Sequence, residues 1–385
     1  KGEIASLFSS LQNFISEGDY AQFGSLLKHL ELMTQEEKLK EGVIKLLTLL
    51  LDRRYPTGTK RRSSLLQMVN HALENIFKAI PLLNEAAGKS FFQIDYAHRH
   101  TLRVPAGGEK ILVINGGQFP PEGEECDARL VVKAYELGWK RFIGYGYRGQ
   151  RFLGCGLGPE TQGVRIDVYG SSGDYLGSGM DGLEVHVHGN AQDQLGQILK
   201  RGKLVVHGDV GQTFLYGAKG GEVYVLGNAA GRPLINAVGR PKVVINGTAL
   251  DFLAESFMAG DPHNGGGFVI VNGLTIDSQG NILPQETPYP GSNLFSLASG
   301  GAIFIRDPYK KIVTEQLNGG EIVPFSDQDW QLILPYLKEN EKLFGIFIEN
   351  HLLTVDGRRC TPAEVYRTVQ PAKQTVLVSG LEEWE

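Results

Sequence analysis

Three histidines occur at spacings that could bring their imidazole rings together. His186 and His188 alternate with valines in the run "LEVHVHG", and His207 follows His188 by 19 residues. Residues two apart in a β-strand share one face, so His186 and His188 would point the same way. If strands recur every 19 residues, His207 would stand beside His188 in one column. Three imidazoles placed like this could bind zinc or another borderline metal.

A second interpretation of these histidines is structural. The sequence supplies no obvious partner groups that would orient the rings, as protein metal sites normally do. We therefore predict a polar ladder on a solvated or subunit-facing surface. Metal binding, or a metal-dependent enzyme that acts through this outward histidine face, stays open as the alternative. The chain is accordingly expected to hold no catalytic residue, no cofactor-binding residue and no metal ligand.

Three other features could also do chemistry. Paired carboxylates need a cleft and two different environments for acid–base work. A regular turn offers neither, so we predict cap or turn roles for Asp174, Asp193 and Asp251, which share a column. Cys126 begins a predicted helix, which would lower the pKa of a thiol, but no histidine stands in a recognisable relation to it. The loop "GDPHNGGG", residues 260–267, could approach a ligand closely, yet we expect a plain loop.

The stretch "GSGMDG", residues 177–182, has the spacing of a dinucleotide-binding loop. Such a loop needs a helix directly after it, because the helix N-terminus faces the pyrophosphate. Here the next residues are "LEVHVHG", which alternate as a β-strand does. We therefore predict that Gly177, Gly179 and Gly182 are turn residues and that no nucleotide binds there.

These glycines belong to a repeat. Strand-like runs end at glycines spaced by 19, 19, 19 and 20 residues, and a sixth copy follows a glycine-rich insertion; the glycines are Gly170, Gly189, Gly208, Gly227, Gly247 and Gly273. Two residues before each glycine stands Val168, Val187, Val206, Val225, Ile245 or Val271. Fixed apolar columns at this period predict coils of a parallel β-helix, stacked at about 4.8 Å. The glycines would occupy sharp corners where a Cβ would clash.

The segments on either side of the repeat have different patterns of apolar residues. Residues 4–87 carry helical apolar periodicity, interrupted at "YPTGTKRR". "KILVING", "CDARLVVKAYELGWK" and "RFIGYGY" predict a β-α-β-like unit. The C-terminal part is expected to form two or three helices that cover the open end of the solenoid. Two helix starts are indicated by "SDQD" and "TPAE", each a cap residue with an acid three positions later.

Composition excludes several classes of protein. The net charge is −5 and no basic patch is present, so a nucleic-acid partner is not expected. No apolar run approaches 18 residues, so no membrane association is expected. The three cysteines, Cys126, Cys155 and Cys360, form no C-x-x-C pair. Their spacing favours a reducing compartment and a cytoplasmic location.

The repeat resembles a known family. The segments "LYGAKGGEVYVLGNAAGRPLINAVG" and "VVINGTALDFLAESFMAG" look like the glycine-repeat (GXGXG) C-terminal domain of the glutamate synthase large subunit. "ARLVVKAYELG" and "GYRGQRFLG" match the start of that domain, and "ASGGAIFIRDP" looks like its closing coil. The similarity covers roughly residues 110–310. The β-helical subunit of formylmethanofuran dehydrogenase is similar as well.

The resemblance implies a mainly β protein with added helices, built on a right-handed parallel β-helix of coils of about 19 residues. We expect an N-terminal helical domain over 1–88, a β-α-β-like leading segment over 89–145, the GXGXG β-helix over 146–308, and a C-terminal helical cap and tail over 309–385. The helical segment and the insertion at 274–292 depart from the family pattern.

In glutamate synthases this domain carries no catalytic residues and holds the amidotransferase and flavin domains in register. The resemblance therefore implies a stand-alone scaffold subunit within a hetero-oligomer. Its partners would be catalytic oxidoreductase subunits that carry FMN or FAD and iron–sulfur clusters, with an amidotransferase as a further partner left open. The alternative is a structural subunit of a formylmethanofuran dehydrogenase-like complex, whose partner would carry molybdenum or tungsten.

Overall fold

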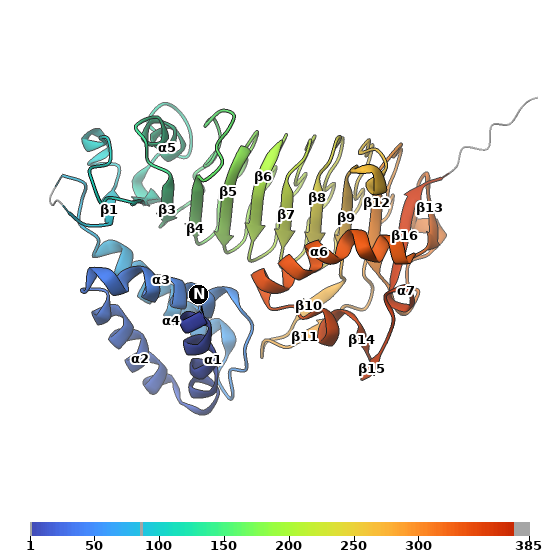
Figure 1. Ribbon diagram of the computed structural model, residues 1–385, viewed down its shortest axis with the longest axis horizontal. Helices are drawn as coiled ribbons and strands as arrows, with labels where there is room; N and C mark the ends of the chain where they lie inside the picture. The colour runs from blue at the N-terminus through green and yellow to red at the C-terminus, as the bar shows by residue number, and fades with distance from the viewer. Residues whose placement is uncertain (1, 85–87, 373–385) are drawn as a thin grey trace, which may run out of the picture.

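The computed structural model describes residues 2–84 and 88–372, and combines helices with one large, mostly parallel sheet (Figure 1). Four helices come first: α1 (Gly2–Glu17), α2 (Tyr20–Met33), α3 (Glu37–Asp52) and α4 (Arg62–Lys78). Their apolar stripes pack together, with Leu47, Leu50 and Leu65 fully buried. The helices predicted within residues 4–87 are therefore present, and the predicted interruption separates α3 from α4.

The sheet has twelve strands, and most neighbours in space are also neighbours in sequence. The β-α-β prediction is confirmed by two parallel strands, β2 and β3, with α5 (Asp127–Glu136) between them. The parallel strands are β1 (Phe91–Ile94), β2 (Ile111–Asn115), β3 (Arg141–Tyr145), β4 (Arg165–Tyr169), β5 (Asp181–His188), β6 (Arg201–Val206), β7 (Glu222–Val225), β8 (Lys242–Ile245), β9 (Phe268–Val271) and β12 (Ala302–Arg306).

Strand register confirms the predicted apolar columns. One row of directly paired, buried side chains runs through Val168, Val187, Val206, Val225, Ile245 and Val271. Alternation puts these side chains on the inner face of the sheet. A second row of parallel bridges, beyond the strand ends, joins Ser172, Ala191, Val210, Ala229 and Ala249. Successive repeats thus stack on one another and enclose a single apolar interior.

The recurring glycines have two different causes. At Gly189, Gly208, Gly227 and Gly247, an added Cβ would lie less than 3.0 Å from backbone atoms of the preceding repeat. Gly170 and Gly273 instead have positive φ angles of 103° and 61°. The stretch "GSGMDG" also has positive φ at each of its glycines and leads directly into β5. A strand and not a helix follows it. The predicted turn is confirmed for Gly177 and Gly179, whereas Gly182 lies inside β5.

Replacing Gly189 by alanine should lower the free energy of unfolding by about 1–3 kcal/mol, because overpacking strains a close-packed site. The new Cβ would meet the carbonyl oxygen of Gly170 at 2.5 Å. Gly42, inside α3, has no atom within 4 Å of the corresponding position. Gly42→Ala should therefore stabilise the protein by up to about 1 kcal/mol through helix propensity. Urea unfolding measures both variants, and equal effects would contradict the close-approach explanation.

The outer face of the sheet is covered by the chain's own helices, as Figure 1 shows below the strands. The N-terminal helices pack on the outer side chains of β1 to β4, among them Ile111, Ile143 and Tyr169. Helix α6 (Asp327–Phe344) packs on those of β6 to β12, including Tyr224 and Phe304. The predicted solvated or subunit-facing outer columns are thus wrong, because these segments bury them within one chain.

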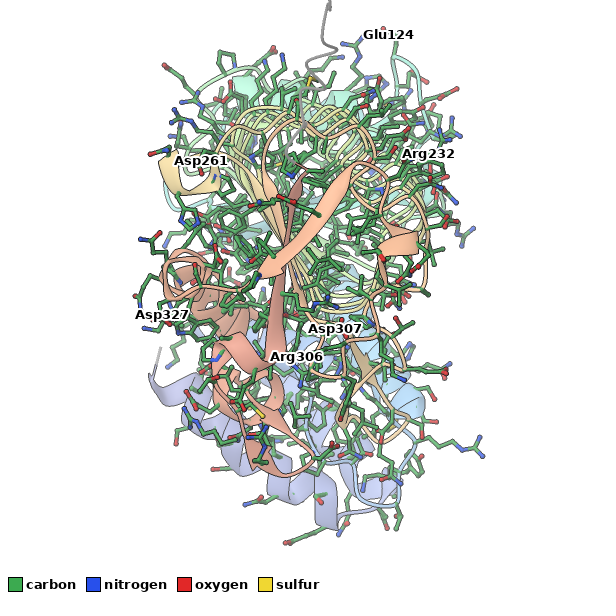
Figure 2. The ribbon with its side chains drawn as sticks, turned by 90° about the vertical axis from the view of Figure 1, so that its right-hand side faces the viewer. Glu124, Arg232, Asp261, Arg306, Asp307 and Asp327 are labelled. Atoms are coloured by element: carbon green, nitrogen blue, oxygen red, sulfur yellow. The ribbon has the colours of Figure 1, made fainter. Side chains whose placement is uncertain are left out.

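The predicted C-terminal helical cap is also wrong in its placement. The stack ends in two antiparallel strands, β16 (Tyr366–Pro371) beside β12 and then β13 (Gly320–Pro324), which cross the end of the molecule nearest the viewer in Figure 2. These strands pair with the backbone N–H and C=O groups at the edge of β12, so β13 becomes the last strand of the sheet. Both predicted helix starts are confirmed. Ser326 and Asp329 form a reciprocal capping box at α6, and at α7 (Pro362–Val365) Glu364 accepts a hydrogen bond from the Thr361 N–H.

The remaining elements are small. Two antiparallel hairpins consist of β10 (Leu274–Ile276) with β11 (Ile282–Pro284), and β14 (Thr354–Val355) with β15 (Arg358–Arg359). The expected tail lies outside the described residues from residue 373 onward. Among the helices of the described ranges, none is long and apolar enough to cross a membrane.

Candidate functional site beneath the N-terminal helices

A cavity of about 630 Å³ lies where the N-terminal helices meet the outer face of the sheet. Helices α1 and α3 form one side, and strands β1 to β5 with the turn after β6 form the other. The last turn of α6 contributes Lys342 and Leu343. The cavity is lined by apolar side chains near α1 and by a cluster of charged and imidazole groups near the strand ends. That cluster contains Asp52, Arg165, Asp167, His186, His188 and His207.

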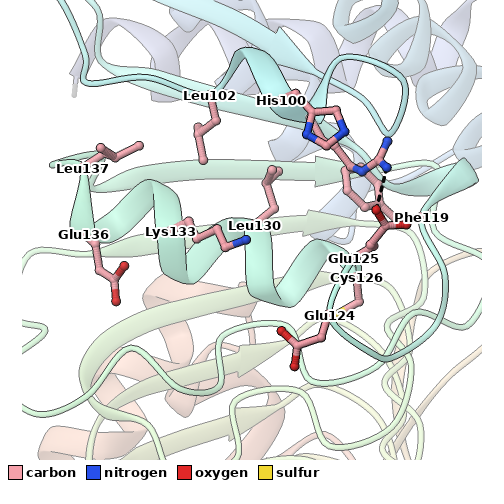
Figure 3. A pocket seen from close by; sticks show the side chains of 11 residues that line it. His100, Leu102, Phe119, Glu124, Glu125, Cys126, Leu130, Lys133, Glu136 and Leu137 are labelled. Atoms are coloured by element: carbon pink, nitrogen blue, oxygen red, sulfur yellow. Dashed lines mark hydrogen bonds and ion pairs between the residues drawn. The ribbon is translucent and has the colours of Figure 1, made fainter.

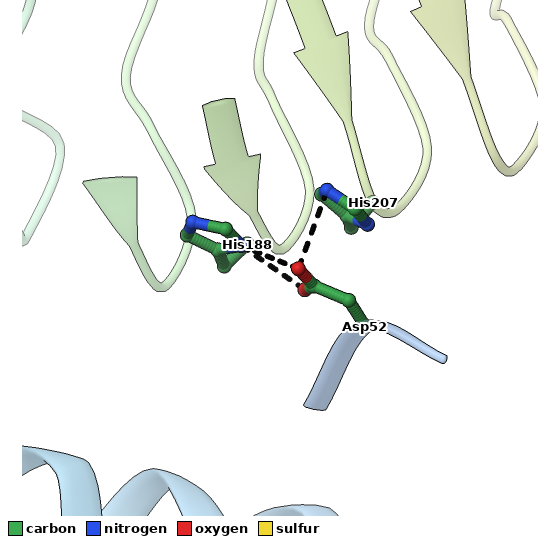
Figure 4. A group of neighbouring side chains, drawn as sticks. All are labelled: Asp52, His188 and His207. Atoms are coloured by element: carbon green, nitrogen blue, oxygen red, sulfur yellow. Dashed lines mark hydrogen bonds and ion pairs between the residues drawn. The ribbon is translucent and has the colours of Figure 1, made fainter. Parts of the chain in front are cut away.

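Local structure explains how these side chains meet. Alternation along β5 turns Val185 and Val187 inward, so His186 and His188 point outward. The repeat then places His207 next to His188, with ring centroids 5.2 Å apart. Helix α3 ends at Asp52, and its carboxylate reaches the two rings from the helical side (Figure 4).

His188 stands between two carboxylates. It donates from Nδ1 to Asp52 at 2.8 Å and from Nε2 to Asp167 Oδ1 at 3.2 Å. Asp167 in turn accepts two hydrogen bonds from Arg165, at 2.7 and 2.9 Å. The side chains of Asp52 and His188 are at least nine-tenths buried. The His188 ring is therefore fixed from both sides by groups that are themselves held in place.

The other two histidines are held differently. His186 donates from Nε2 to Glu184 at 2.6 Å, and it makes no contact with Asp52. The Nε2 atom of His207 lies 3.3 Å from Asp52 Oδ2. Within the described residues, neither ring nitrogen of His207 forms a hydrogen bond, and its Nδ1 is buried without a partner. His207 packs edge-on against Phe344 of α6.

Charge is distributed unevenly over the cluster. Burial alone would lower the pKa of His188, but the carboxylates of Asp52 and Asp167 outweigh it and raise the pKa to about 9. Burial lowers the pKa of His207 to about 3, because the attraction of Asp52 does not compensate. Burial would raise the pKa of Asp167, yet His188 and Arg165 hold it well below its ordinary value. At neutral pH the cluster thus contains a charged His188 and an uncharged His207.

The sequence identified the histidines but not the groups that accompany them. Asp167 is paired in register with His186. An acidic residue within an otherwise apolar strand was the sequence signal that could have identified it as a partner of the histidines. Asp52 lies 136 residues before His188 and belongs to a different structural unit, so no local pattern could have indicated it. The expectation that the rings lack orienting partners is wrong, because Asp52 and Asp167 supply them.

The other sequence candidates have structural roles. Asp174 and Asp193 accept hydrogen bonds from the backbone N–H groups of Asp193 and Gln212 in the next repeat. Asp251 does the same for Ser292. In the loop 260–267, His263 contacts Asp329 of α6 at 2.9 Å, so that loop is held against a helix.

A second cavity, of about 480 Å³, lies beside α5 (Figure 3). Cys126 caps that helix, as predicted, but its side chain is buried. Glu125 on the rim is paired with Arg99 at 2.7 Å. His100 lines the same cavity without any hydrogen bond to Cys126 among the residues described. The constellation therefore lacks the nucleophile–base contact that covalent catalysis requires.

Residues 146–354, more than half of the 385-residue chain, match a family model described as the GXGXG motif. The match begins in the turn after β3 and ends in β14. His186, His188 and His207 lie inside it, whereas Asp52 lies outside. No curated protein matches the chain.

Proposed function

Because this chain belongs to the GXGXG motif family, we propose that it is a non-catalytic scaffold subunit of a glutamate synthase-like oxidoreductase complex. Domains of this family are found in glutamate synthase-type proteins. The observation that carries the proposal is the run of stacked repeats within residues 146–354, which contributes β4 to β9 and β12 to the parallel part of the sheet and encloses a continuous apolar interior. We take these coils to form a right-handed parallel β-helix, a rigid frame for other subunits.

The surface that would receive partners is the turn side of the stack. The outer face of the strands is already covered by α3, α4 and α6. Large apolar side chains remain exposed in the turns between strands, among them Ile198 and Leu297, which are 40% and 74% exposed. These two residues occupy the same left-handed position of their repeats, with φ of 55° and 53°. In the repeats between them, this position holds Gly217, Asn236 and Ser256. The two exposed apolar side chains would therefore serve as two separate contact points for a partner on the turn side.

The partners in this proposal are flavin and iron–sulfur subunits that carry FMN or FAD and the clusters, with an amidotransferase as an additional candidate. This chain would supply position rather than chemistry. Its three cysteines are unpaired thiols, two of them buried, and do not form the set of four that a cluster needs.

Native purification through an affinity tag on this chain tests the proposal. We expect flavin and iron–sulfur subunits in stoichiometric amounts, identified by mass spectrometry and by a visible spectrum. Ile198→Asp combined with Leu297→Asp should remove them, because each carboxylate would be buried unpaired in the interface. Leu32→Asp is the matched control, since Leu32 is 55% exposed but lies on α2.

Two outcomes would contradict the proposal. One is a chain that purifies alone from its native cells under gentle conditions. The other is a stoichiometric partner that carries molybdenum or tungsten in place of flavin, which would move the chain to the formylmethanofuran dehydrogenase-like class.

A further inference from the structure

We propose that Asp52, His188 and His207 bind a divalent transition-metal ion of the zinc type. This inference goes beyond a scaffold function. The three residues come from α3, β5 and the turn after β6, so the ion would join the N-terminal helices to the sheet (Figure 4). Two imidazoles and one carboxylate form a ligand set that zinc and its neighbours prefer.

The ligand atoms are already close to the required separation. All three lie within 4.8 Å of one another. Asp52 Oδ2 is 2.8 Å from His188 Nδ1 and 3.3 Å from His207 Nε2. Ligands around a tetrahedral zinc ion lie about 3.3 Å apart, given bonds of about 2.0–2.1 Å. Small side-chain movements would therefore suffice to accommodate an ion.

His188 has the supporting contacts that ligating histidines typically make. Its Nε2 donates to Asp167, and Arg165 fixes that carboxylate with two hydrogen bonds. This leaves Nδ1 directed at Asp52. A carboxylate on the far nitrogen both orients a ligating ring and increases its basicity. The ion would take the place of the proton that His188 Nδ1 shares with Asp52.

His207 is the least satisfied member of the cluster. Its side chain is only 5% exposed, yet in the described part of the chain neither ring nitrogen forms a hydrogen bond. Buried polar groups are normally hydrogen-bonded, so an exception calls for an explanation. Nε2 is the ring nitrogen that faces Asp52, so an ion between the two would use the Nε2 lone pair, while Nδ1 would keep its unpaired position.

The fourth ligand position would face the cavity of about 630 Å³ that these three residues line. Three protein ligands plus an open position are typical of sites that keep an exchangeable water, whereas closed structural sites use four protein ligands. The same cavity provides a path by which an ion could enter.

The test uses the full chain, purified without a histidine tag and stripped with a chelator. We expect calorimetry with zinc to show one ion per chain, and cobalt to give the visible absorption of a tetrahedral nitrogen–oxygen site. Asp52→Asn and His207→Gln should each weaken zinc binding at least tenfold. His186→Gln is the matched control, because His186 lies on the same strand face and is equally buried but contacts Glu184 instead. It should bind zinc as the unaltered chain does.

A measurement on the unaltered chain keeps the test valid if a variant fails to fold. With ¹⁵N-labelled histidine, zinc should shift the ring nitrogens of two of the nine histidines strongly. Absence of stoichiometric binding, or no ring signal that responds to zinc, would overturn the proposal. So would a His186→Gln variant that loses as much affinity as His207→Gln.

Discussion

Replacing Phe257 by alanine is expected to lower the free energy of unfolding by about 3–5 kcal/mol, the range for removal of a buried aromatic ring. Phe257 lies in the segment that connects β8 to β9, and its side chain is fully buried. Its ring centroid lies 6.1 Å from that of Phe295 in a later repeat. Its backbone carbonyl oxygen accepts hydrogen bonds from Ser299 and Gly300. Those contacts survive the substitution, so the loss would report on packing of the interior. Urea unfolding followed by far-ultraviolet circular dichroism measures it.

The neighbouring residue supplies the control. Met258 belongs to the same turn but is 50% exposed. Its replacement by alanine should change stability by no more than about 0.5 kcal/mol. If Met258→Ala and Phe257→Ala destabilised the protein equally, the apolar interior would not be the main source of stability at this turn.

Asp167→Ala is expected to cost about 3–5 kcal/mol, because it removes one partner of a buried ion pair and leaves the others uncompensated. The Asp167 side chain is 10% exposed and binds both Arg165 and His188. Without it, two cationic groups lie beneath the N-terminal helices with fewer carboxylates to balance them. The measurement is again the midpoint of urea unfolding.

A surface pair of the same chemistry is the comparison. Glu124 and Arg129 are paired at 3.1 Å, but both side chains are mostly exposed. Glu124→Ala should cost at most about 1 kcal/mol, since water screens such pairs. A double variant, Arg165→Met with Asp167→Leu, should recover much of the stability lost in Asp167→Ala, because paired apolar groups need no compensation. Failure to recover would show that His188, rather than Arg165, depends on Asp167.

Sequence periodicity was sufficient to predict the stacked repeats. The column from Val168 to Val271 is found in strand register as expected, because each side chain is fixed by contact with its counterpart one repeat away. The turn glycines follow from the same stacking: Gly189 is excluded from carrying a Cβ by Gly170, its equivalent in the preceding repeat. Sequence could also reject the nucleotide loop, since the strand after "GSGMDG" is a local property.

Periodicity could not predict which other elements pack against the repeats. Helix α6 has ordinary amphipathic periodicity, which predicts a helix but not the face it covers. The chain places it along the outer side chains of β6 to β12, and two antiparallel strands end the stack instead.

The candidate site likewise combines features that the sequence predicts with features that only the structure decides. By itself, the sequence determined that His186, His188 and His207 share one face, because strand alternation and the repeat period are short-range rules. Only the tertiary structure decided that Asp52 joins His188 and His207 while His186 turns to Glu184. The end of α3 reaches those rings because the N-terminal helices pack through their apolar side chains on the outer face of the sheet. That placement depends on many non-directional apolar contacts. Such contacts produce no characteristic residue spacing that could be recognised in the sequence.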